Sequence, residues 1–234
     1  MRYVYFDVVD FTKSRSIEAQ TDILLDLNRI VAEVISGVEG LIDQAMLLPT
    51  GDGVCICLVN TIRPYDLDIR IALDVLDRLF LLRKEKIDQT RQFEVRVGLN
   101  ENQDNLIVDS RGCSNVVGLG INTAQRIMSV AGPSRLMLGS TVFERLSQRE
   151  SYQSWIRPAP AIVKHGQRLR CYEFFNPALR CFSGSALRSA QMPLSNTAGG
   201  RSGNDIVSLP LDSASERQSK RPTSKTSLSF ELSS

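Results

Sequence analysis

The chain has 234 residues, of which 42% are hydrophobic and 23% charged, as is ordinary for a globular protein. A formal net charge of +2 argues against wholesale binding to nucleic acid or to a membrane surface. No apolar run approaches the ~18 residues that span a bilayer, and the N-terminus lacks a signal-peptide pattern. The five cysteines form no C-x-x-C pair and only one histidine is present, which argues against a zinc site and favours a reducing compartment. We therefore expect a cytoplasmic protein.

Hydrophobic periodicity and turn residues predict the elements of the first hundred residues. They are a strand at 2–9, a helix capped by Ser16 that stops near Gly37 or Gly40, a hairpin of 44–49 and 54–59 around the turn 50–53, a helix from Pro64 to about Ile87, and a strand at 93–99. This β-α-β-β-α-β order is the ferredoxin-like plan, an α+β fold in which helices cover one face of an antiparallel sheet. In that plan the first strand is central and pairs with the third.

Shorter elements are predicted for the rest of the chain. They are a strand at 106–109, a loop at 110–115, a helix through about Val130, a strand at 136–138, a short helix capped by Ser140 that runs to Leu146, and a hairpin of 153–163 and 169–175. From about residue 179 the sequence is rich in Ser, Arg, Gly and Thr and has no sustained period. Such a segment buries too little surface to offset the entropy of ordering. We therefore expect one folded domain at 1–178 and a disordered tail at 179–234.

Two acidic residues, Asp7 and Asp52, stand at the ends of neighbouring predicted strands. Asp7 closes the apolar first strand, and Asp52 lies in the Thr-Gly-Asp-Gly turn of the hairpin. If the third strand pairs with the first, the turn brings Asp52 towards Asp7. Carboxylates placed together in this way suit Mg²⁺ or Mn²⁺, which prefer oxygen ligands and leave positions open for phosphates. Taken singly, each acid is as well explained by a strand-end cap or a hairpin Asp.

A second candidate lies in the helix after Gly118 and Gly120. Asn122 and Arg126 are four residues apart and share one helix face, where an amide and a guanidinium can hold a ribose and a polyphosphate. Solvated or structural roles are the simpler reading of either residue alone. The glycines form no G-x-G-x-x-G fingerprint. Lys164, in the last hairpin, can contact phosphate or be an exposed turn lysine.

Taken in order, these motifs resemble the catalytic domain of class III nucleotidyl cyclases. The family's F-x-D-I-x-G-F-T strand matches residues 5–12, its G-D hairpin matches Gly51 and Asp52, and its R-x-G strand matches 96–98. The V-x-G-x-x-V-N-x-A-x-R helix matches 116–126. The resemblance spans about residues 3–176.

The resemblance implies a head-to-tail homodimer that cyclises a nucleoside triphosphate at sites shared between protomers. Asp7 and Asp52, with the backbone carbonyl of Val8, are implied to hold two divalent metal ions, Mn²⁺ or Mg²⁺. Asn122 and Arg126 of the other chain are implied as catalytic residues. Substrate contacts are implied for Phe11 and Thr12 of the first loop and for three further residues, Leu48, Asn115 and Lys164.

Three positions depart from the adenylyl cyclase pattern. Leu48 stands where those enzymes carry a base-reading lysine, Asn115 stands where they carry Asp, and Asp10 replaces the glycine of the first loop. The purine-reading pair is thus missing, and an amide such as Asn115 can pair with a pyrimidine edge. A short cyclase of this kind resembles the stand-alone pyrimidine cyclases of Pycsar antiphage defence, which make cyclic UMP or cyclic CMP for a separate effector. That resemblance implies UTP or CTP as substrate.

Other functions remain open from the sequence. The same three departures are consistent with a degenerate cyclase-homology domain that senses nucleotides without catalysis, and a purine cyclase is a further alternative. A third hypothesis is a nucleic-acid-binding domain in which Tyr3 and Tyr5 form a stacking platform. The near-neutral charge argues against it, so we expect neither nucleic-acid nor membrane partners.

Overall fold

A computed structural model describes residues 1–61, 64–164 and 167–182, and not the side chains of 160–167. The strands of the main sheet are β1 (Arg2–Val8), β2 (Ala45–Pro49), β3 (Gly53–Leu58), β4 (Val95–Glu101), β7 (Leu136–Gly139), β8 (Ile156–Lys164) and β9 (Gln167–Phe174). A separate hairpin consists of β5 (Asn105–Val108) and β6 (Ser114–Val117). The helices are α1 (Ile17–Ser36), α2 (Leu67–Glu85), α3 (Leu119–Ser129), α4 (Ser140–Leu146), α5 (Glu150–Gln153) and the 3₁₀ turns η1 (Gln89–Arg91) and η2 (Arg180–Phe182).

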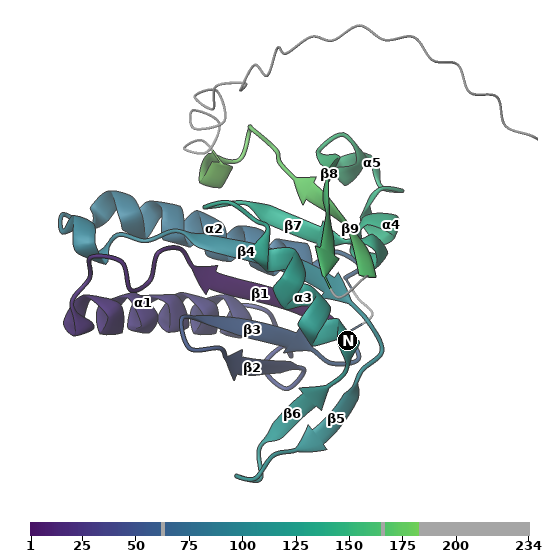
Figure 1. Cartoon of the computed structure of the whole chain (residues 1–234), viewed down its shortest axis with the longest axis horizontal. Coiled ribbons are helices and arrows are strands. Elements are labelled where there is room, and N and C mark those ends of the chain that lie inside the picture. The colour runs from purple at the N-terminus through teal and green to yellow at the C-terminus, as the bar shows by residue number, and fades with distance from the viewer. Residues whose placement is uncertain (62–63, 165–166, 183–234) are drawn as a thin grey trace, which may run out of the picture. The chain divides into compact units, whose positions relative to one another are not determined.

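The main sheet has the strand order β2-β3-β1-β4-β7-β9-β8. Its pairs are antiparallel except for β4 with β7, which is parallel. The central place of β1, between β3 and β4, confirms the predicted α+β plan and the pairing of the first strand with the third. Figure 1 shows the long helices α1 and α2 together on one side of this sheet, with α3 crossing the other side.

The alternation of side chains along β1 divides the core into two clusters. Val4, Phe6 and Val8 point to the side of α1 and α2, where most of the buried aliphatic residues gather. Tyr3 and Tyr5 point to the opposite side, where they pack with α3 and with cysteines of β3. The ferredoxin-like plan predicted helices on one face only, so α3 is an addition to it. Because both tyrosines are buried, neither offers the stacking surface that the nucleic-acid hypothesis required.

Several predicted boundaries shift in the structure. Helix α2 begins at Leu67 rather than Pro64, since Pro64 forms a turn in which its carbonyl accepts from the Leu67 amide. Ser140 is the first residue of α4 rather than its cap, which is Gly139. In the β2–β3 hairpin the positive φ belongs to Gly51, at 91°, while Gly53 already pairs with Asp7. Strand β6, helix α5 and the turn η1 were not predicted.

The C-terminal part of the described chain packs beyond the predicted domain boundary. Phe182 in η2 is 1% exposed and its ring lies against Phe174 and Phe175. Residues of the core therefore occur as far along the chain as Phe182, four residues past the predicted boundary at 178. The remainder of the predicted tail, 183–234, lies outside the described residues. Within the described part, no helix combines the length and apolar character needed to cross a membrane.

Candidate active site

The hairpin and the central strand bring Asp7 and Asp52 together. Asp7 on β1 lies opposite Gly53 on β3, and the Val8 amide donates to the Asp52 carbonyl at 3.0 Å. Gly53 permits this approach, because a Cβ atom there would lie 2.1 Å from the Phe6 carbonyl oxygen. Asp7 is 7% exposed. Burial raises the pKa of Asp7, and the nearby Asp52 carboxyl raises it further.

Arg96 supplies the positive charge beside these two acids. It lies opposite Asp7 in the β1–β4 pairing, and its guanidinium donates through Nε and Nη2 to Asp7 Oδ2, with Nε at 3.0 Å. This contact opposes the rise in the pKa of Asp7. In the chain alone, the arginine thus offsets charge that a metal ion would otherwise neutralise. Arg96 belongs to the R-x-G motif at 96–98, for which no role was predicted from the sequence.

The acid pair fits a divalent ion that phosphate oxygens help to coordinate. Within the described residues, no group of three or more His, Cys, Asp or Glu side chains comes together. Two carboxylates, with the Val8 carbonyl as the predicted third ligand, leave most of a coordination shell open. Mg²⁺ commonly binds proteins in this way, through one or two carboxylates plus substrate phosphates. The donors therefore suit an ion that arrives with, or is completed by, a triphosphate.

Asn122 and Arg126 lie on α3, on the same side of the sheet as Asp7. Asn122 is exposed, and its side-chain amide donates to the Gly118 carbonyl at 3.1 Å. Arg126 is half-buried and, within the described chain, forms no ion pair with an acid. Neither side chain hydrogen-bonds to Asp7 or Asp52 in the part of the chain that the structure describes.

Leu48 and Asn115 lie on strands that contact each other. Leu48 on β2 pairs with Cys55 on β3, which in turn pairs with Tyr5 on β1. Leu48 is therefore two strands away from Tyr5, which precedes Asp7 by two residues. Asn115 belongs to β6, which touches β2, and its Oδ1 accepts from the Val116 amide at 2.7 Å. Leu48 and Val116 pack in the same apolar cluster. Strands β2 and β6, which carry the two positions predicted to read the base, therefore contact each other, but alternation along β6 turns Asn115 to the face opposite Val116.

The other predicted substrate contacts are less gathered. Phe11 packs against the core on the side of α1 and α2, and Thr12 is exposed in the loop after β1. Asp10, which replaces the family's glycine, has a φ of 52°, a left-handed conformation that Asp tolerates better than most residues. Lys164 ends β8, and its side chain lies outside the described part of the structure.

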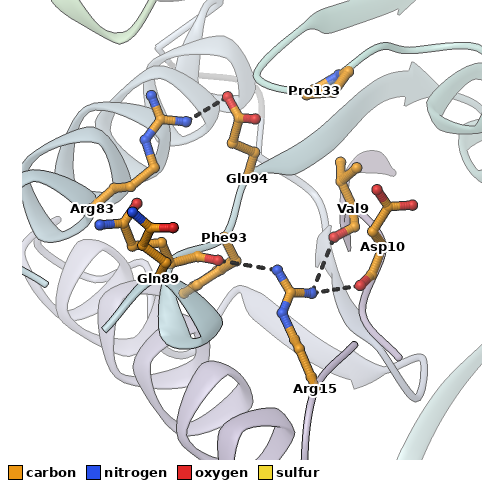
Figure 2. Close-up of a pocket in the computed structure, with 9 residues that line it drawn as sticks. Val9, Asp10, Arg15, Arg83, Gln89, Phe93, Glu94 and Pro133 are labelled. Atoms are coloured by element: carbon orange, nitrogen blue, oxygen red, sulfur yellow. Dashed lines mark hydrogen bonds and ion pairs between the residues drawn. The ribbon is translucent and has the colours of Figure 1, made fainter. Parts of the chain in front are cut away.

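A polar cavity of about 540 Å³ opens beside this loop, where β1 ends and β4 begins. Figure 2 shows Arg15 reaching from below to the carbonyls of Val9 and Asp10, and Arg83 paired with Glu94. Arg15 also donates to the carbonyls of Thr90 and Gln92. Its guanidinium is therefore used to fix the loop after Asp7 rather than left open for a ligand. The acid pair does not line this cavity.

Solved structures of similar shape identify the fold. The guanylate cyclase domain of RhGC from Catenaria anguillulae, in complex with GTP, aligns with a TM-score of 0.58 and 16% identity over 74% of this chain and 94% of that one. The adenylyl cyclase CyaB from P. aeruginosa aligns with a TM-score of 0.59 and 15% identity over 75% and 93%. The fold is that of a class III nucleotide cyclase catalytic domain. An adenylate/guanylate cyclase/hydrolase from Silicibacter pomeroyi matches similarly, with a TM-score of 0.56 and 15% identity over 75% and 95%.

The likeness is one of structure. The sequence matches no protein-family model and no curated protein. Because the identities are near 15%, these comparisons establish the fold and assign no role to any residue.

Proposed function

We propose that the protein is a nucleotide cyclase that converts a nucleoside triphosphate to its 3′,5′-cyclic nucleotide and pyrophosphate. The observation that carries this proposal is the juxtaposition of Asp7 and Asp52 across β1 and the β2–β3 turn, in a fold shared with cyclase domains. A buried carboxylate beside a second one is costly unless a cation is bound nearby. Arg96 supplies one positive charge for the two acids, and a bound divalent ion would supply the remainder.

In this proposal the chain's own groups position and neutralise the substrate. Asp7, Asp52 and the Val8 carbonyl hold two divalent ions, Mn²⁺ or Mg²⁺, which neutralise the triphosphate and activate the ribose 3′-hydroxyl when bound. Asn122 orients the ribose so that the 3′-oxygen faces the α-phosphorus. Arg126 stabilises the charge that builds on the α-phosphate as pyrophosphate leaves. Positioning and charge neutralisation supply most of the rate.

The active site is proposed to form between two copies of the chain. Asn122 and Arg126 form no hydrogen bond with the acids within one described chain, and a second protomer is proposed to supply them. The β5–β6 hairpin, which Figure 1 shows extending away from the main sheet, gives such a dimer apolar surface to bury. Its exposed hydrophobic residues are Leu106, Ile107, Val108 and Val117, and the exposed Leu119 follows at the start of α3. Side chains of this kind in a projecting hairpin favour an interface.

A pyrimidine is the proposed base. Leu48 offers no hydrogen bond to a purine, and its neighbours along the sheet are Cys55 and Tyr5. Asn115 lies on β6, which contacts β2, and its amide can pair with uracil or cytosine. UTP or CTP is therefore the proposed substrate. The cyclic product is proposed to act on a separate effector, in the manner of antiphage signalling.

The test is incubation of the purified protein with ATP, GTP, UTP and CTP separately, in the presence of Mn²⁺, followed by separation of the products. We expect cyclic UMP or cyclic CMP, and no turnover by Asp7→Ala or Asp52→Ala, with the dimer intact in both variants. A purine product alone would refute the pyrimidine assignment and leave the cyclase proposal standing. Absence of cyclic product from all four nucleotides would refute both.

The alternative is a domain that binds nucleotides without cyclising them. The ion pair between Arg96 and Asp7 favours it, because a guanidinium already compensates the buried acid. In that case UTP or CTP should raise the melting temperature of the protein without being consumed. The product assay therefore separates the two functions.

A further inference from the structure

Asp104 lies in the link between β4 and β5 and gathers four hydrogen bonds. Its Oδ1 accepts from the side-chain amide of Asn102 at 2.8 Å and from the Gly120 backbone amide at 3.1 Å. Its Oδ2 accepts from the Tyr3 hydroxyl at 2.6 Å and from the Ile121 backbone amide at 3.2 Å. One carboxylate thus joins β1 to the first turn of α3.

The amides that Asp104 binds are those that a helix cannot satisfy by itself. The first four N–H groups of a helix have no partner within it, and the residue at the N-cap usually supplies one. In α3 that residue is Gly118, which has no side chain to do so. Asp104, from outside the helix, takes the place of the cap. Asn100 on β4 holds the same turn by donating to the Gly120 carbonyl at 2.9 Å.

The two glycines of this segment make room for the carboxylate. A Cβ atom on Gly118 would lie 2.2 Å from Asp104 Oδ1, and one on Gly120 would lie 2.5 Å from Asp104 Oδ2. The group that approaches the backbone at these glycines is the Asp104 carboxylate. The contact with Asp104 therefore explains why residues 118 and 120 are glycines.

The charge states of the pair suit the contact. Tyr3 is fully buried, and burial together with its bond to Asp104 raises the pKa of its hydroxyl, which remains a donor. Burial tends to raise the pKa of Asp104, but the bonds from Tyr3, Gly120, Asn102 and Ile121 outweigh it and lower that pKa. A charged carboxylate is thus held at the positive end of the helix dipole.

We propose that Tyr3 and Asp104 are a positioning pair that sets where α3 presents Asn122 and Arg126, an inference that rests on the proposed cyclase function. Apolar packing by Ala124, Ile127 and Met128 holds α3 on the sheet, but such packing is non-directional and fixes its axial position weakly. The hydrogen bonds to Gly120 and Ile121 are directional, and Asn122 is the next residue. A small misplacement there is costly, because catalysis depends on sub-ångström alignment.

The test compares Tyr3→Phe and Asp104→Asn with matched controls. Tyr152→Phe removes a similar buried bond, from the Tyr152 hydroxyl to Asp66 at 2.8 Å, far from α3 in sequence. Asp66→Asn alters the carboxylate that accepts this Tyr152 bond, outside the β5–β6 hairpin. We expect kcat to fall about tenfold or more in Y3F and D104N with KM within about threefold, and both controls to keep the wild-type kcat.

Amide hydrogen exchange provides a readout that does not need activity. Exchange at Gly120 and Ile121 should accelerate in Y3F and D104N and stay unchanged in Y152F. Unchanged exchange would overturn the anchoring, whether or not the wild-type protein proves to be a cyclase. An unchanged kcat in Y3F and D104N, or an equal fall in Y152F, would overturn the positioning role. A wild-type protein without cyclase activity refutes the proposed function, and the exchange data then decide the anchoring alone.

Discussion

At the scale of single residues, the two carboxyls of the acid pair share one nearby guanidinium, that of Arg96. Asp7 is buried and close to Asp52, so its ionised form is disfavoured unless a cation is near. Arg96 is that cation in the chain alone, and its Nε and Nη2 both donate to Asp7 Oδ2. A divalent ion that binds the two acids must therefore compete with the arginine for Asp7 or displace it.

Arg96→Gln should increase the affinity for Mn²⁺ severalfold in the absence of nucleotide, because it removes a positive charge beside the ion. The same variant should melt at a lower temperature without metal, since Asp7 and Asp52 then face each other uncompensated. Electron paramagnetic resonance of free Mn²⁺ and thermal unfolding with and without the ion measure the two effects. Arg83→Gln is the matched control, because Arg83 pairs with Glu94 instead. Equal Mn²⁺ affinity in R96Q and the wild type would show that Arg96 does not compete for the site.

At the scale of elements, α3 is held by a tertiary cap whose strength depends on pH. The lowered pKa of Asp104 means that the folded state favours its ionised form. The stabilisation is therefore present above its ordinary value of 3.8 and is lost as the pH falls through the lower folded value. At low pH the neutral carboxyl of Asp104 resembles the amide of an Asn.

The wild type should accordingly be more stable than Asp104→Asn at pH 7, by about 1.5–3 kcal/mol, which is typical of hydrogen bonds to a charged group. This difference should shrink steadily as the pH falls below the ordinary value for an Asp carboxyl. Urea unfolding of both proteins over a series of pH values measures it. A difference that stays constant down to pH 3 would mean that the charge of Asp104 contributes nothing to the cap.

The elements also show how far local sequence patterns carry. The order β1-α1-β2-β3-α2-β4, the cap at Ser16 and a helix end near Gly37 or Gly40 were predicted, because strand alternation, helical periodicity and cap chemistry are local signals. The nearness of Asp52 to Asp7 followed from the hairpin and one strand pairing. Strand β6 was missed, since its four residues lie in a projecting hairpin with one buried side chain among them and carry no alternating pattern.

Contacts that depend on register or on distant segments could not be predicted. Arg96 meets Asp7 only because β4 is antiparallel to β1 in one particular register, which a pattern does not specify. Asp104 caps α3 from 16 residues before Gly120, beyond the reach of any capping motif read along the chain. The predicted acids were thus accessible from the sequence, whereas the cation beside them was not.

At the scale of the whole molecule, a buried charge network joins α2, α4 and β4 at the end of the sheet away from the acid pair. Asp68 on α2 is fully buried and accepts from Arg145 on α4, which also donates to Glu101 on β4 at 2.9 Å and to the Tyr65 carbonyl. Burial raises the pKa of Asp68, and Arg145 opposes that rise. The arginine is what makes an ionised Asp68 tolerable there.

Arg145→Met should therefore lower the free energy of unfolding by about 3–5 kcal/mol, because it leaves a buried carboxylate without its partner. Arg78→Met is the control, since Arg78 makes two ion pairs with half-exposed acids, Glu33 and Asp74, and such pairs contribute about 0–1 kcal/mol. Chemical denaturation of the two variants gives the comparison. A loss in R145M no larger than that in R78M would contradict the role assigned to the network.

The central claim is that two protomers share each active site, with the acids from one chain and Asn122 and Arg126 from the other. Mixing two inactive variants, Asp7→Ala and Arg126→Ala, tests it directly. After subunit exchange, a mixed dimer has one site with both lesions and one site with none, so the mixture should regain about a quarter of the wild-type turnover. Each variant alone should remain inactive. A mixture that forms mixed dimers and yet makes no cyclic nucleotide, beside an active wild type, would contradict the account.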